Sequence, residues 1–421
     1  NLLSIATVLR QAGLPVIFLD ASVEPERFHA LAAGNFSSIG AVVMLVATHS
    51  FTSDVAILAS IKSRNPAIRS IICGAHPTAL PESCLRHPAI DFCVCPEPEF
   101  ALRDLLLSLR DGTAPDKVRG IAFRHPGGVA VTAPYPFVPL DELPIPDRTL
   151  LPAGRDYFNP LVEQMPYTTL QTSRGCQGYC SFCSVPAFYG NSVRYRSAKG
   201  VIAEISQLAG LGFRELIFRD ETFTSFRERN IHICEWLIAR QLNLRWIANA
   251  RVDTVDAGML QLMRRAGCHL LKFGVETGND ELLAALGKGI TTAQTAAAFR
   301  LAHDAGIATH AHVMLGVPGE TETTIRHTLA FVRRLKPATA SFGILTAYPG
   351  TPLFASMPGA AGRDGTEADL SHLHTTAFHN TALGCSLSPD ELARWVRRCY
   401  RAFYLRPSYL LRWLPALTDR H

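Results

Sequence analysis

The sequence SRGCQGYCSFC, at residues 173–183, decides the fold of the second half of this chain. Its three cysteines, Cys176, Cys180 and Cys183, follow a β-branched run at residues 168–172 that is typical of a buried strand. Three thiolates on one short loop can bind three irons of a cubane cluster and leave the fourth iron open. A structural zinc site would need a fourth ligand, and no further cysteine pair or His-x₃₋₅-His motif lies nearby. An iron–sulfur site is therefore favoured over zinc and over a chance grouping of cysteines.

Strands and helices alternate from this stretch toward the C-terminus. Strands are expected at residues 168–172, 215–219, 245–249, 271–275, 309–315 and 341–345. Helices are expected between them, at residues 198–211, 228–241, 256–266, 280–286, 292–305 and 322–335. Six such units form a partial (βα)6 barrel, whose chemistry lies at the carboxyl ends of its strands. Because the cysteine loop directly follows the first strand, it is predicted to lie at that end.

The first third of the chain shows a second alternation. Strands are expected at residues 16–19, 41–46, 69–73 and 91–95, helices at 24–33, 53–63 and 99–109, and a hairpin at 118–132. Continuous apolar strands between helices indicate a parallel sheet that is covered on both faces. Such sheets bind ligands beyond the carboxyl ends of their strands, here in the loops at residues 20–24, 48–52 and 74–78.

These patterns predict an α/β protein in four parts. They are a doubly wound, Rossmann-like domain at residues 1–132, a proline-rich linker at 133–165, the partial barrel at 166–352 and a small helical C-terminal region at 353–421. In the last part, helices are expected at residues 389–403 and 408–414. The chain opens with an amphipathic helix, whereas an α/β domain normally opens with a strand, so we expect the first strand to precede residue 1.

Composition excludes several classes of protein. The chain has 421 residues, of which 48% are hydrophobic and 18% charged, which excludes wholesale disorder. A net charge of +5 predicts no nucleic-acid groove, and the apolar runs are much shorter than a membrane-spanning helix requires. There is no signal-peptide pattern, and the other cysteines are scattered rather than paired. We therefore predict a cytoplasmic protein.

The cysteine spacing C-x₃-C-x-φ-C, with Phe182 at φ, resembles the radical S-adenosylmethionine (SAM) enzymes. The resemblance extends to RYRS at residues 194–197, FRDETFT at 218–224, GVETG at 274–278 and YPGTP at 348–352. It implies that Cys176, Cys180 and Cys183 bind a [4Fe–4S] cluster that chelates SAM and reduces it to a 5′-deoxyadenosyl radical.

The same resemblance implies a set of SAM-binding residues. Phe182 and the backbone near Tyr348 would flank adenine, and Glu276 would hold the ribose hydroxyls or the amine of SAM. The remaining members are Arg196 for the SAM carboxylate, Asp220 and Glu221 near the SAM amine, and Gly274 for close approach of the backbone. For the carboxylates and the arginine, ordinary ion pairs are the alternative.

The N-terminal domain resembles the cobalamin-binding domain of the B12-dependent radical SAM subfamily. The marker is GAHPT at residues 74–78 after a buried strand, together with Asp91 and the acidic turn CPEPE at 95–99, where the family usually has Gly-Glu-Gly-Glu. The implied cobalamin-binding residues are Thr48, Ser50, Gly74, Ala75, His76 and Thr78. The turn DASVE at residues 20–24 contains no histidine, so cobalamin is expected to bind base-off without a protein imidazole. A domain that no longer binds cobalamin is the alternative. A methylthiotransferase is rejected, because the N-terminal cysteines do not have a ligand spacing.

Taken with the resemblance, the sequence predicts a cobalamin-dependent radical SAM methyltransferase. It would move a methyl group through methylcobalamin to an unactivated carbon, or to phosphorus, of a natural-product or lipid-like substrate. A B12-dependent radical SAM cyclase or rearrangement enzyme is the alternative, followed by a non-enzymatic cobalamin or cluster sensor.

Candidate residues and partners follow from this prediction. His310 and His312 share one face of the fifth barrel strand and are candidates for substrate contact or proton donation, with satisfied core histidines as the alternative. Arg251 is a similar candidate. The expected partners are a small-molecule substrate, an external electron donor such as flavodoxin or ferredoxin, and no nucleic acid. The aromatic, leucine- and arginine-rich segment at residues 404–414 suggests peripheral membrane contact, against simple packing on the barrel.

Overall fold

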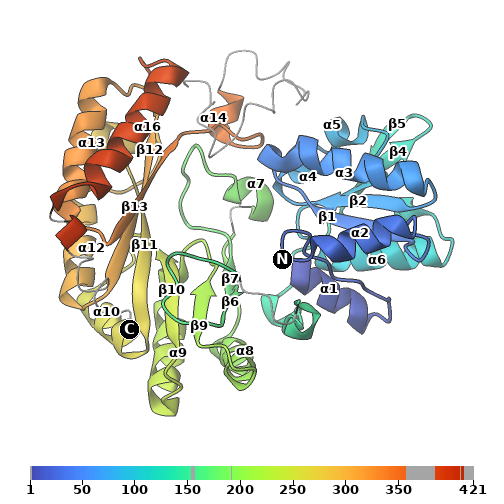
Figure 1. Ribbon diagram of the computed structural model, residues 1–421, viewed down its shortest axis with the longest axis horizontal. Helices are drawn as coiled ribbons and strands as arrows, with labels where there is room; N and C mark the ends of the chain where they lie inside the picture. The colour runs from blue at the N-terminus through green and yellow to red at the C-terminus, as the bar shows by residue number, and fades with distance from the viewer. Residues whose placement is uncertain (1, 153–156, 191, 357–384, 408, 412–421) are drawn as a thin grey trace. The chain divides into compact units, whose positions relative to one another are not determined.

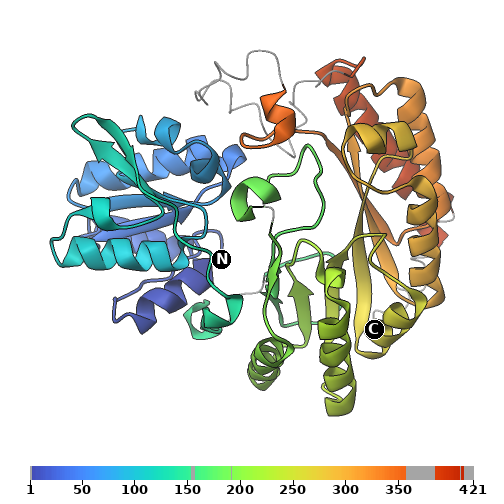
Figure 2. The same cartoon turned by 180° about the vertical axis from the view of Figure 1, so that it is seen from behind.

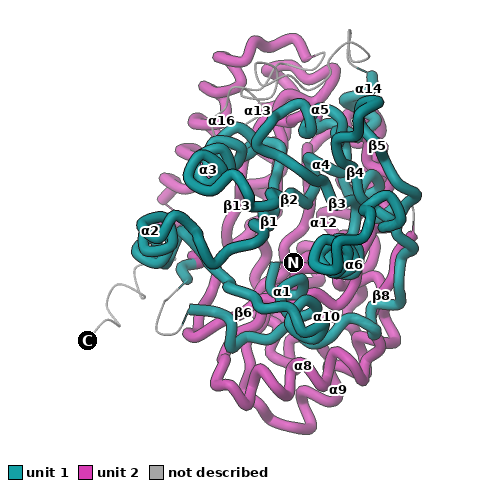
Figure 3. The backbone as a smooth tube through the Cα atoms, turned by 90° about the vertical axis from the view of Figure 1, so that its right-hand side faces the viewer, with its two compact units in different colours: residues 1–158, 184–190, 348–372 teal, residues 159–183, 191–347, 373–421 magenta. Residues whose placement is uncertain are grey.

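The computed structural model describes residues 2–152, 157–190, 192–356, 385–407 and 409–411 (Figure 1). The chain divides into two compact units (Figure 3). Unit 1 comprises residues 1–158, 184–190 and 348–372, and unit 2 comprises residues 159–183, 191–347 and 373–421. Each unit therefore contains segments from distant parts of the sequence.

The sheet of unit 1 has five strands in the order β1-β2-β3-β4-β5. They are β1 (Ala41–Leu45), β2 (Arg69–Cys73), β3 (Phe92–Val94), β4 (Ile121–His125) and β5 (Gly128–Val131). The first three pair in parallel, and β4 and β5 form an antiparallel hairpin on β3. The hairpin and the three parallel strands were predicted from the sequence, and the structure confirms them.

Helices cover both faces of this sheet. The helices of unit 1 are α1 (Leu2–Gln11), α2 (Pro25–Ala33), α3 (Phe51–Arg64), α4 (Ala75–Ala79), α5 (Pro81–Leu85), α6 (Pro98–Arg110), α7 (Val185–Tyr189) and α14 (Pro352–Ala355). Short 3₁₀ turns lie at η1 (Thr48–Ser50), η2 (Pro115–Lys117), η3 (Leu140–Glu142) and η4 (Arg148–Leu150). On one face, Ile5 of α1 and Leu102 of α6 pack against Ile71 of β2, and on the other Ile61 of α3 packs near Val42 of β1. This doubly wound arrangement is the one that the alternating pattern predicted.

The predicted strand at residues 16–19 is wrong. Among the described residues this stretch pairs with no strand, and β1 bonds only to β2. Val16 still packs on the core, whereas Ile17 is exposed. An extended segment becomes a strand only through the ladder hydrogen bonds of a neighbour, and an apolar run by itself does not provide one.

Unit 2 contains six parallel strands in the order β6-β9-β10-β11-β12-β13. They are β6 (Tyr167–Leu170), β9 (Glu215–Phe218), β10 (Arg245–Ala250), β11 (Cys268–Glu276), β12 (Ala308–Leu315) and β13 (Thr339–Ile344). The helices between them are α8 (Ala198–Gly210), α9 (Arg227–Arg240), α10 (Ala257–Arg265), α11 (Asp280–Ala285), α12 (Thr292–Asp304) and α13 (Glu322–Leu335), and η5 (Phe223–Ser225) is a 3₁₀ turn. A two-stranded ladder, β7 (Ser173–Arg174) with β8 (Arg194–Tyr195), flanks the cysteine loop. The predicted partial (βα)6 barrel is confirmed.

Residues of the two strand faces have different surroundings. Side chains such as Phe218, Phe273 and Val313 point outward into one apolar core shared with the helices, which line one side of the sheet in Figures 1 and 2. Those in alternate positions point inward, and at the amino ends of the strands Ile217 and Leu270 close the inner face with an apolar floor. Alternation along each strand therefore separates the structural core from the surface on which chemistry can occur.

The C-terminal helix α16 (Pro389–Tyr404) packs on β13. The Tyr404 hydroxyl donates to the Ala340 carbonyl at 2.7 Å and accepts from its amide at 2.9 Å. This helix was predicted at residues 389–403. Of the predicted helix at 408–414, residues 409–411 are helical, while 408 and 412–414 lie outside the described residues. No helix in the described part of the chain is long and apolar enough to cross a membrane.

Candidate active site

The cysteine loop begins at the end of β7, at the carboxyl edge of the barrel. A Cβ added at Gly178 would lie 3.6 Å from the Sγ atoms of both Cys176 and Cys180, so these two thiols flank one glycine. The Gly178 amide donates to the Cys176 Sγ at 3.4 Å. Cys180 is buried, Cys176 and Cys183 are half-buried, and burial raises the pKa of the Cys180 thiol. A cationic partner that stabilises the thiolate is therefore needed at this site.

Positive charge lies close to these sulfurs. The Nη1 atom of Arg251 is 2.7 Å from the position of a Gly178 Cβ, and both Arg251 and Lys288 act to lower the pKa of Cys180. Arg251 is held by Asp253, with N–O distances of 2.9 and 2.8 Å, and by the Lys288 carbonyl at 3.2 Å. The sequence suggested Arg251 as a substrate residue, whereas the geometry places it beside the thiols.

The donor set fits a multi-iron cluster better than a single ion. Within the described residues, no three His, Cys, Asp or Glu side chains converge on a point that would hold one metal ion. A mononuclear zinc site needs such convergence, whereas each iron of a cubane takes one thiolate of its own. Three neighbouring thiols with cations beside them are suited to the second arrangement.

Asp220, at the end of β9, fixes the start of the cysteine loop. Its carboxylate accepts from the Thr172 amide at 2.6 Å, from the Thr172 hydroxyl at 2.5 Å and from the Ser173 hydroxyl at 2.7 Å. Arg229 lies 3.8 Å away, and the Asp220 side chain is completely enclosed. These contacts occupy its oxygens, so they favour a positioning role over the expected contact with the SAM amine.

Glu221, the next residue, has a different environment. Its Oε2 atom is buried and has no hydrogen-bond partner among the described residues. Burial raises the pKa of Glu221 to about 7, although a hydrogen bond from the Gly175 backbone opposes this shift. An unpaired carboxylate oxygen beside the residue that precedes Cys176 is suited to receive an ammonium group.

Arg196 is engaged in the protein itself. Its guanidinium forms an ion pair with Glu204 of α8 and donates to the Gly200 carbonyl at 3.1 Å. Both charged side chains are buried. These contacts hold the segment after β8 against α8. They favour the alternative in which Arg196 forms an ordinary ion pair within the protein.

Glu276 forms a buried pair with Lys288, which the sequence analysis did not single out. The Lys288 Nζ donates to the Glu276 Oε1 at 2.6 Å. Burial alone would lower the pKa of Lys288, but the charges of Glu276 and Cys180 raise it above its usual value. A Cβ at Gly274 would lie 2.4 Å from the Glu276 Oε1 and 2.7 Å from the Lys288 Nζ, so any other residue there would displace this pair. Glu276 itself has φ +62°, a rare conformation for a residue with a side chain.

The loop that carries Lys288 also supports the cysteine loop. The Ser181 amide donates to the Leu286 carbonyl at 2.9 Å, and a Cβ at Gly287 would approach the Tyr179 carbonyl to 3.1 Å. Gly287 and Gly289 both have positive φ. The signal in the sequence was this Gly-Lys-Gly triplet, since two such glycines around one lysine indicate a tight loop that presents it.

His310 and His312 lie on the inner face of β12. The His310 Nδ1 is 2.7 Å from the Thr339 hydroxyl and its Nε2 is 3.2 Å from the Ser341 hydroxyl, which also lies 2.9 Å from the His312 Nδ1. Desolvation lowers the pKa of His310 to about 3, and it also lowers the pKa of His312. The His310 ring is therefore neutral at pH 7, and its two partners favour the satisfied-histidine alternative. The His312 side chain is partly desolvated, but it keeps surface that is open to solvent.

In unit 1 the predicted cobalamin-binding residues come together at the carboxyl ends of β1 and β2. Gly74 has φ +119°, and a Cβ there would lie 2.5 Å from the Val46 carbonyl oxygen, so the turn after β2 requires glycine. The His76 Nδ1 is 3.3 Å from the Thr48 hydroxyl, and its ring packs at 4.2 Å on Phe51. His76 is completely buried, and its contact with Thr48 links the loop after β2 to the loop after β1.

The other predicted members of this set surround that junction. Ser50 donates to Asp54 at 2.6 Å, and Thr78 donates to the Gly74 carbonyl at 2.7 Å. Ala75 is exposed beside them. Small side chains at a sheet edge leave room for a large planar ligand, in agreement with the position that the strand pattern predicted.

Two segments that lie beyond residue 180 complete unit 1. Helix α7 packs on α4, and a Cβ at Gly350 would lie 3.2 Å from the Cβ of Ala187 and 3.3 Å from that of Ala79. The carbonyl of Tyr348, the predicted adenine neighbour, accepts from the Thr351 amide and hydroxyl at 3.1 and 2.7 Å in the turn before α14. Phe182, the other predicted adenine neighbour, is half-buried in the cysteine loop of unit 2.

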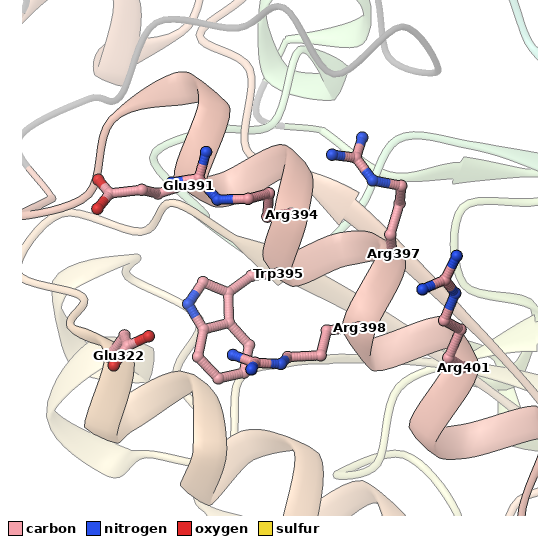
Figure 4. A pocket seen from close by; sticks show the side chains of 7 residues that line it. All are labelled: Glu322, Glu391, Arg394, Trp395, Arg397, Arg398 and Arg401. Atoms are coloured by element: carbon pink, nitrogen blue, oxygen red, sulfur yellow. The ribbon is translucent and has the colours of Figure 1, made fainter.

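A separate hollow lies on the surface of α16 (Figure 4). It is lined by Glu322, Glu391, Arg394, Trp395, Arg397, Arg398 and Arg401. Arg398 and Arg326 each lie 4.8 Å from the centre of the Trp395 ring, a cation–π distance. None of the predicted cofactor ligands lines it, so it is not the candidate active site.

Comparison with known proteins gives the same two parts. Residues 170–332 match the Radical SAM superfamily, and residues 1–106 match the B12 binding domain. An uncharacterized methyltransferase of Pyrococcus horikoshii is 31% identical over 375 residues, covering 88% of this chain and 80% of that protein. The anaerobic magnesium-protoporphyrin IX monomethyl ester cyclase of Rubrivivax gelatinosus is 32% identical over 361 residues, covering 83% of this chain and 63% of that enzyme.

A solved structure shows the same fold. The radical S-adenosylmethionine methyltransferase TsrM of Kitasatospora setae, with tryptophan and a SAM analog bound, superposes with a TM-score of 0.72 at 21% identity. The match covers 83% of this chain and 71% of TsrM. The resemblance inferred from the sequence motifs is thus confirmed. The chain belongs to the radical SAM superfamily, in the group of enzymes with an N-terminal B12-binding domain, whose cofactors are SAM, a [4Fe–4S] cluster and cobalamin.

Proposed function

We propose that this chain is a cobalamin-dependent methyltransferase that acts on an unactivated carbon, or on phosphorus, of a natural-product or lipid-like substrate. The observation that carries the proposal is the cysteine loop at the carboxyl edge of a barrel, in a chain that also has a B12-binding domain. The relative from Pyrococcus horikoshii, which is named a methyltransferase, supports this assignment.

The chain's own residues hold and orient the cofactors. When bound, the cluster and SAM supply a radical that removes a substrate hydrogen, and cobalamin supplies the methyl carrier. Cys176, Cys180 and Cys183 bind the cluster, while Arg251 and Lys288 offset the charge of the thiolates. This offset favours the deprotonated form that metal binding requires.

SAM is held by groups that the protein leaves available. Glu221 receives the SAM ammonium through its unpartnered Oε2 atom, which the structure leaves buried. Glu276, oriented by its pair with Lys288 and with Gly274 beside it, would hold the ribose, and Phe182 would flank the adenine. Asp220 and Arg196 are positioning residues that do not contact SAM themselves. Their own contacts fix the cysteine loop and the segment after β8.

The loops that carry Thr48, Ser50 and residues 74–78 would hold cobalamin without offering it a protein imidazole. The turn at residues 20–24 contains no histidine, and His76 is completely enclosed. The absorption spectrum of the bound cobalamin would then be that of the base-off form, without coordination by a protein nitrogen.

The test is anaerobic reconstitution with iron, sulfide and hydroxocobalamin, followed by reduction with SAM and candidate substrates. Formation of both S-adenosylhomocysteine and 5′-deoxyadenosine in a substrate-dependent way is expected. Cys180→Ala should abolish 5′-deoxyadenosine, whereas Cys385→Ala, at a half-buried cysteine remote in sequence, should leave it unchanged. Substrate-dependent formation of only one of the two nucleosides would refute methyl transfer.

A cyclase or rearrangement enzyme is the second candidate, and the 32% identity to the cyclase of Rubrivivax gelatinosus favours it. This function predicts 5′-deoxyadenosine without S-adenosylhomocysteine. Any SAM cleavage by the reduced protein would exclude a cofactor-based sensor.

Partners of the enzyme are also proposed here. A one-electron donor such as flavodoxin or ferredoxin would reduce the cluster, and replacing dithionite with a reduced flavodoxin tests this. Leu405, Leu410 and Leu411 are exposed at the end of the chain, and together they would contact a membrane surface. Co-sedimentation with anionic lipid vesicles, lost in a Leu410→Ser, Leu411→Ser variant, would support this contact, and absence of binding by the unaltered protein would exclude it.

A further inference from the structure

The inner face of the barrel is organised in rows that the strand register defines. Ile217, Ile247 and Leu270 form the apolar floor. Two residues further along the strands, Asn249 pairs with Lys272, Lys272 with His310, and His310 with Thr339. Arg219 stands two residues beyond Ile217, which pairs with Ile247, so it lies at the level of Asn249. The row above the floor therefore reads Arg219, Asn249, Lys272, His310, Thr339.

This row carries two cations that lack a counter-ion. In the part of the chain that the structure describes, neither the Arg219 nor the Lys272 side chain makes a hydrogen bond or an ion pair. Arg219 is exposed and Lys272 half-exposed, so solvent reaches both. Burial, and to a smaller extent the charge of Arg219, lowers the pKa of Lys272 to about 8, in agreement with the places of the two cations in one row.

The neighbouring polar groups do not neutralise these charges. The Asn249 amide donates to the Asp220 carbonyl at 2.7 Å, and His310 is neutral with its two hydroxyl partners. The acids on β9 and β11 are committed elsewhere, Glu215 to His269 and Glu276 to Lys288. Asp220, just after β9, is committed to the cysteine loop. Two neighbouring cations without a counter-ion repel each other, and an anion bound between them would relieve this repulsion.

We propose that Arg219 and Lys272 bind an anionic group of the substrate, a carboxylate or a phosphate-type oxyanion. The planar fork of the arginine fixes the orientation of such a group and the lysine adds a point charge. This inference rests on the proposed function and defines its substrate class. The row is distinct from the proposed ribose-binding Glu276, because Lys272 lies four residues before Glu276 on β11, about 13 Å at 3.3 Å per residue. The substrate therefore reaches from this row toward the cofactors.

The experiment is chemical footprinting of lysines in the cluster- and cobalamin-loaded protein. The protein is acetylated with an N-hydroxysuccinimide ester at pH 7.5, with and without inorganic pyrophosphate as probe, and each lysine is quantified by mass spectrometry. Pyrophosphate is expected to protect Lys272 at least about fivefold and to leave exposed Lys199 of α8 unprotected. Arg219→Met, which keeps the apolar stem, should weaken this protection roughly tenfold in pyrophosphate concentration. Arg219→Lys should retain most of it.

Two results would overturn the inference. One is the absence of protection of Lys272 in the unaltered protein, an arm that needs no variant. The other is equal protection in Arg219→Met protein that retains its iron and cobalamin, because the anion would then bind elsewhere. If Arg219→Met loses its iron, Arg219→Gln replaces it and is judged by the same criterion. Nucleoside formation is measured separately, so SAM cleavage without anion protection defeats this inference alone, and protection without SAM cleavage defeats the proposed function.

Discussion

Replacing Asp220 by asparagine should destabilise the barrel and loosen the cysteine loop. The carboxylate accepts three hydrogen bonds within 2.7 Å and faces Arg229, whose pKa is lowered by burial. The substituted side chain would keep one acceptor oxygen, but Arg229 would lose its buried counter-charge, a loss that typically costs about 3–5 kcal/mol. We therefore expect the unfolding free energy of unit 2 to fall by about that amount, together with the iron retained per chain.

Tryptophan fluorescence during urea unfolding measures this unit selectively, because all four tryptophans lie at or after residue 236. Asp256→Asn is the matched control, since Asp256 is exposed and caps α10, where asparagine is an equally good cap. The reasoning is refuted if Asp220→Asn keeps its urea midpoint and its iron but binds SAM more weakly. That pattern would mean that Asp220 contacts SAM directly.

Three further substitutions test other parts of the site. Gly74→Ala places a Cβ 2.5 Å from the Val46 carbonyl oxygen. It should lower the unfolding free energy by about 2 kcal/mol or more and reduce the amount of cobalamin retained after desalting. The control Gly210→Ala, which has open space around the added methyl group, should change neither quantity. The folded chain holds the Glu221 proton up to about pH 7, whereas the unfolded chain releases it near pH 4.5, so the unfolding free energy should fall as the pH rises through that window. The difference between the urea midpoints at pH 5 and pH 7.5 should therefore be smaller in Glu221→Gln than in the unaltered protein. An unchanged difference would count against the burial of this group. Lys288→Met leaves the Glu276 carboxylate buried without its partner and should lower the unfolding free energy by about 3–5 kcal/mol in the same fluorescence assay. Adding Glu276→Gln to this variant should restore part of the lost stability. If it restores none, the broken ion pair is not the cause of the loss.

Periodicity located most elements because each strand carries two different environments. The strand predicted at residues 245–249 appears as Arg245–Ala250, since Trp246 and Ala248 must enter the helix-covered core while the alternate positions do not. The stretch at residues 16–19 has the same apolar character but no ladder neighbour, and a local pattern does not encode a pairing partner.

The polar site was harder to predict than the fold. Spacing identified the three cysteines, because their chemistry requires them on one loop. It did not separate Asp220, whose oxygens are occupied by the protein, from Glu221, which has an unpartnered oxygen, although the two are adjacent. Nor did it find Lys288, whose partner lies twelve residues earlier, on the other side of α11. Which polar groups are satisfied is set by three-dimensional neighbours, so it becomes visible only in the folded chain.

The discontinuous make-up of unit 1 constrains how this enzyme can be recombined with its relatives. A hybrid that takes residues 1–158 from another member would bring a foreign α4 against the resident Ala187 and Gly350. The contact is close, because a Cβ at Gly350 would lie only 3.3 Å from the Cβ of Ala79. Residues 184–190 and 348–352 must therefore be transplanted with the N-terminal segment. For the same reason, these three stretches are expected to vary together among relatives, as a single module inherited in three pieces.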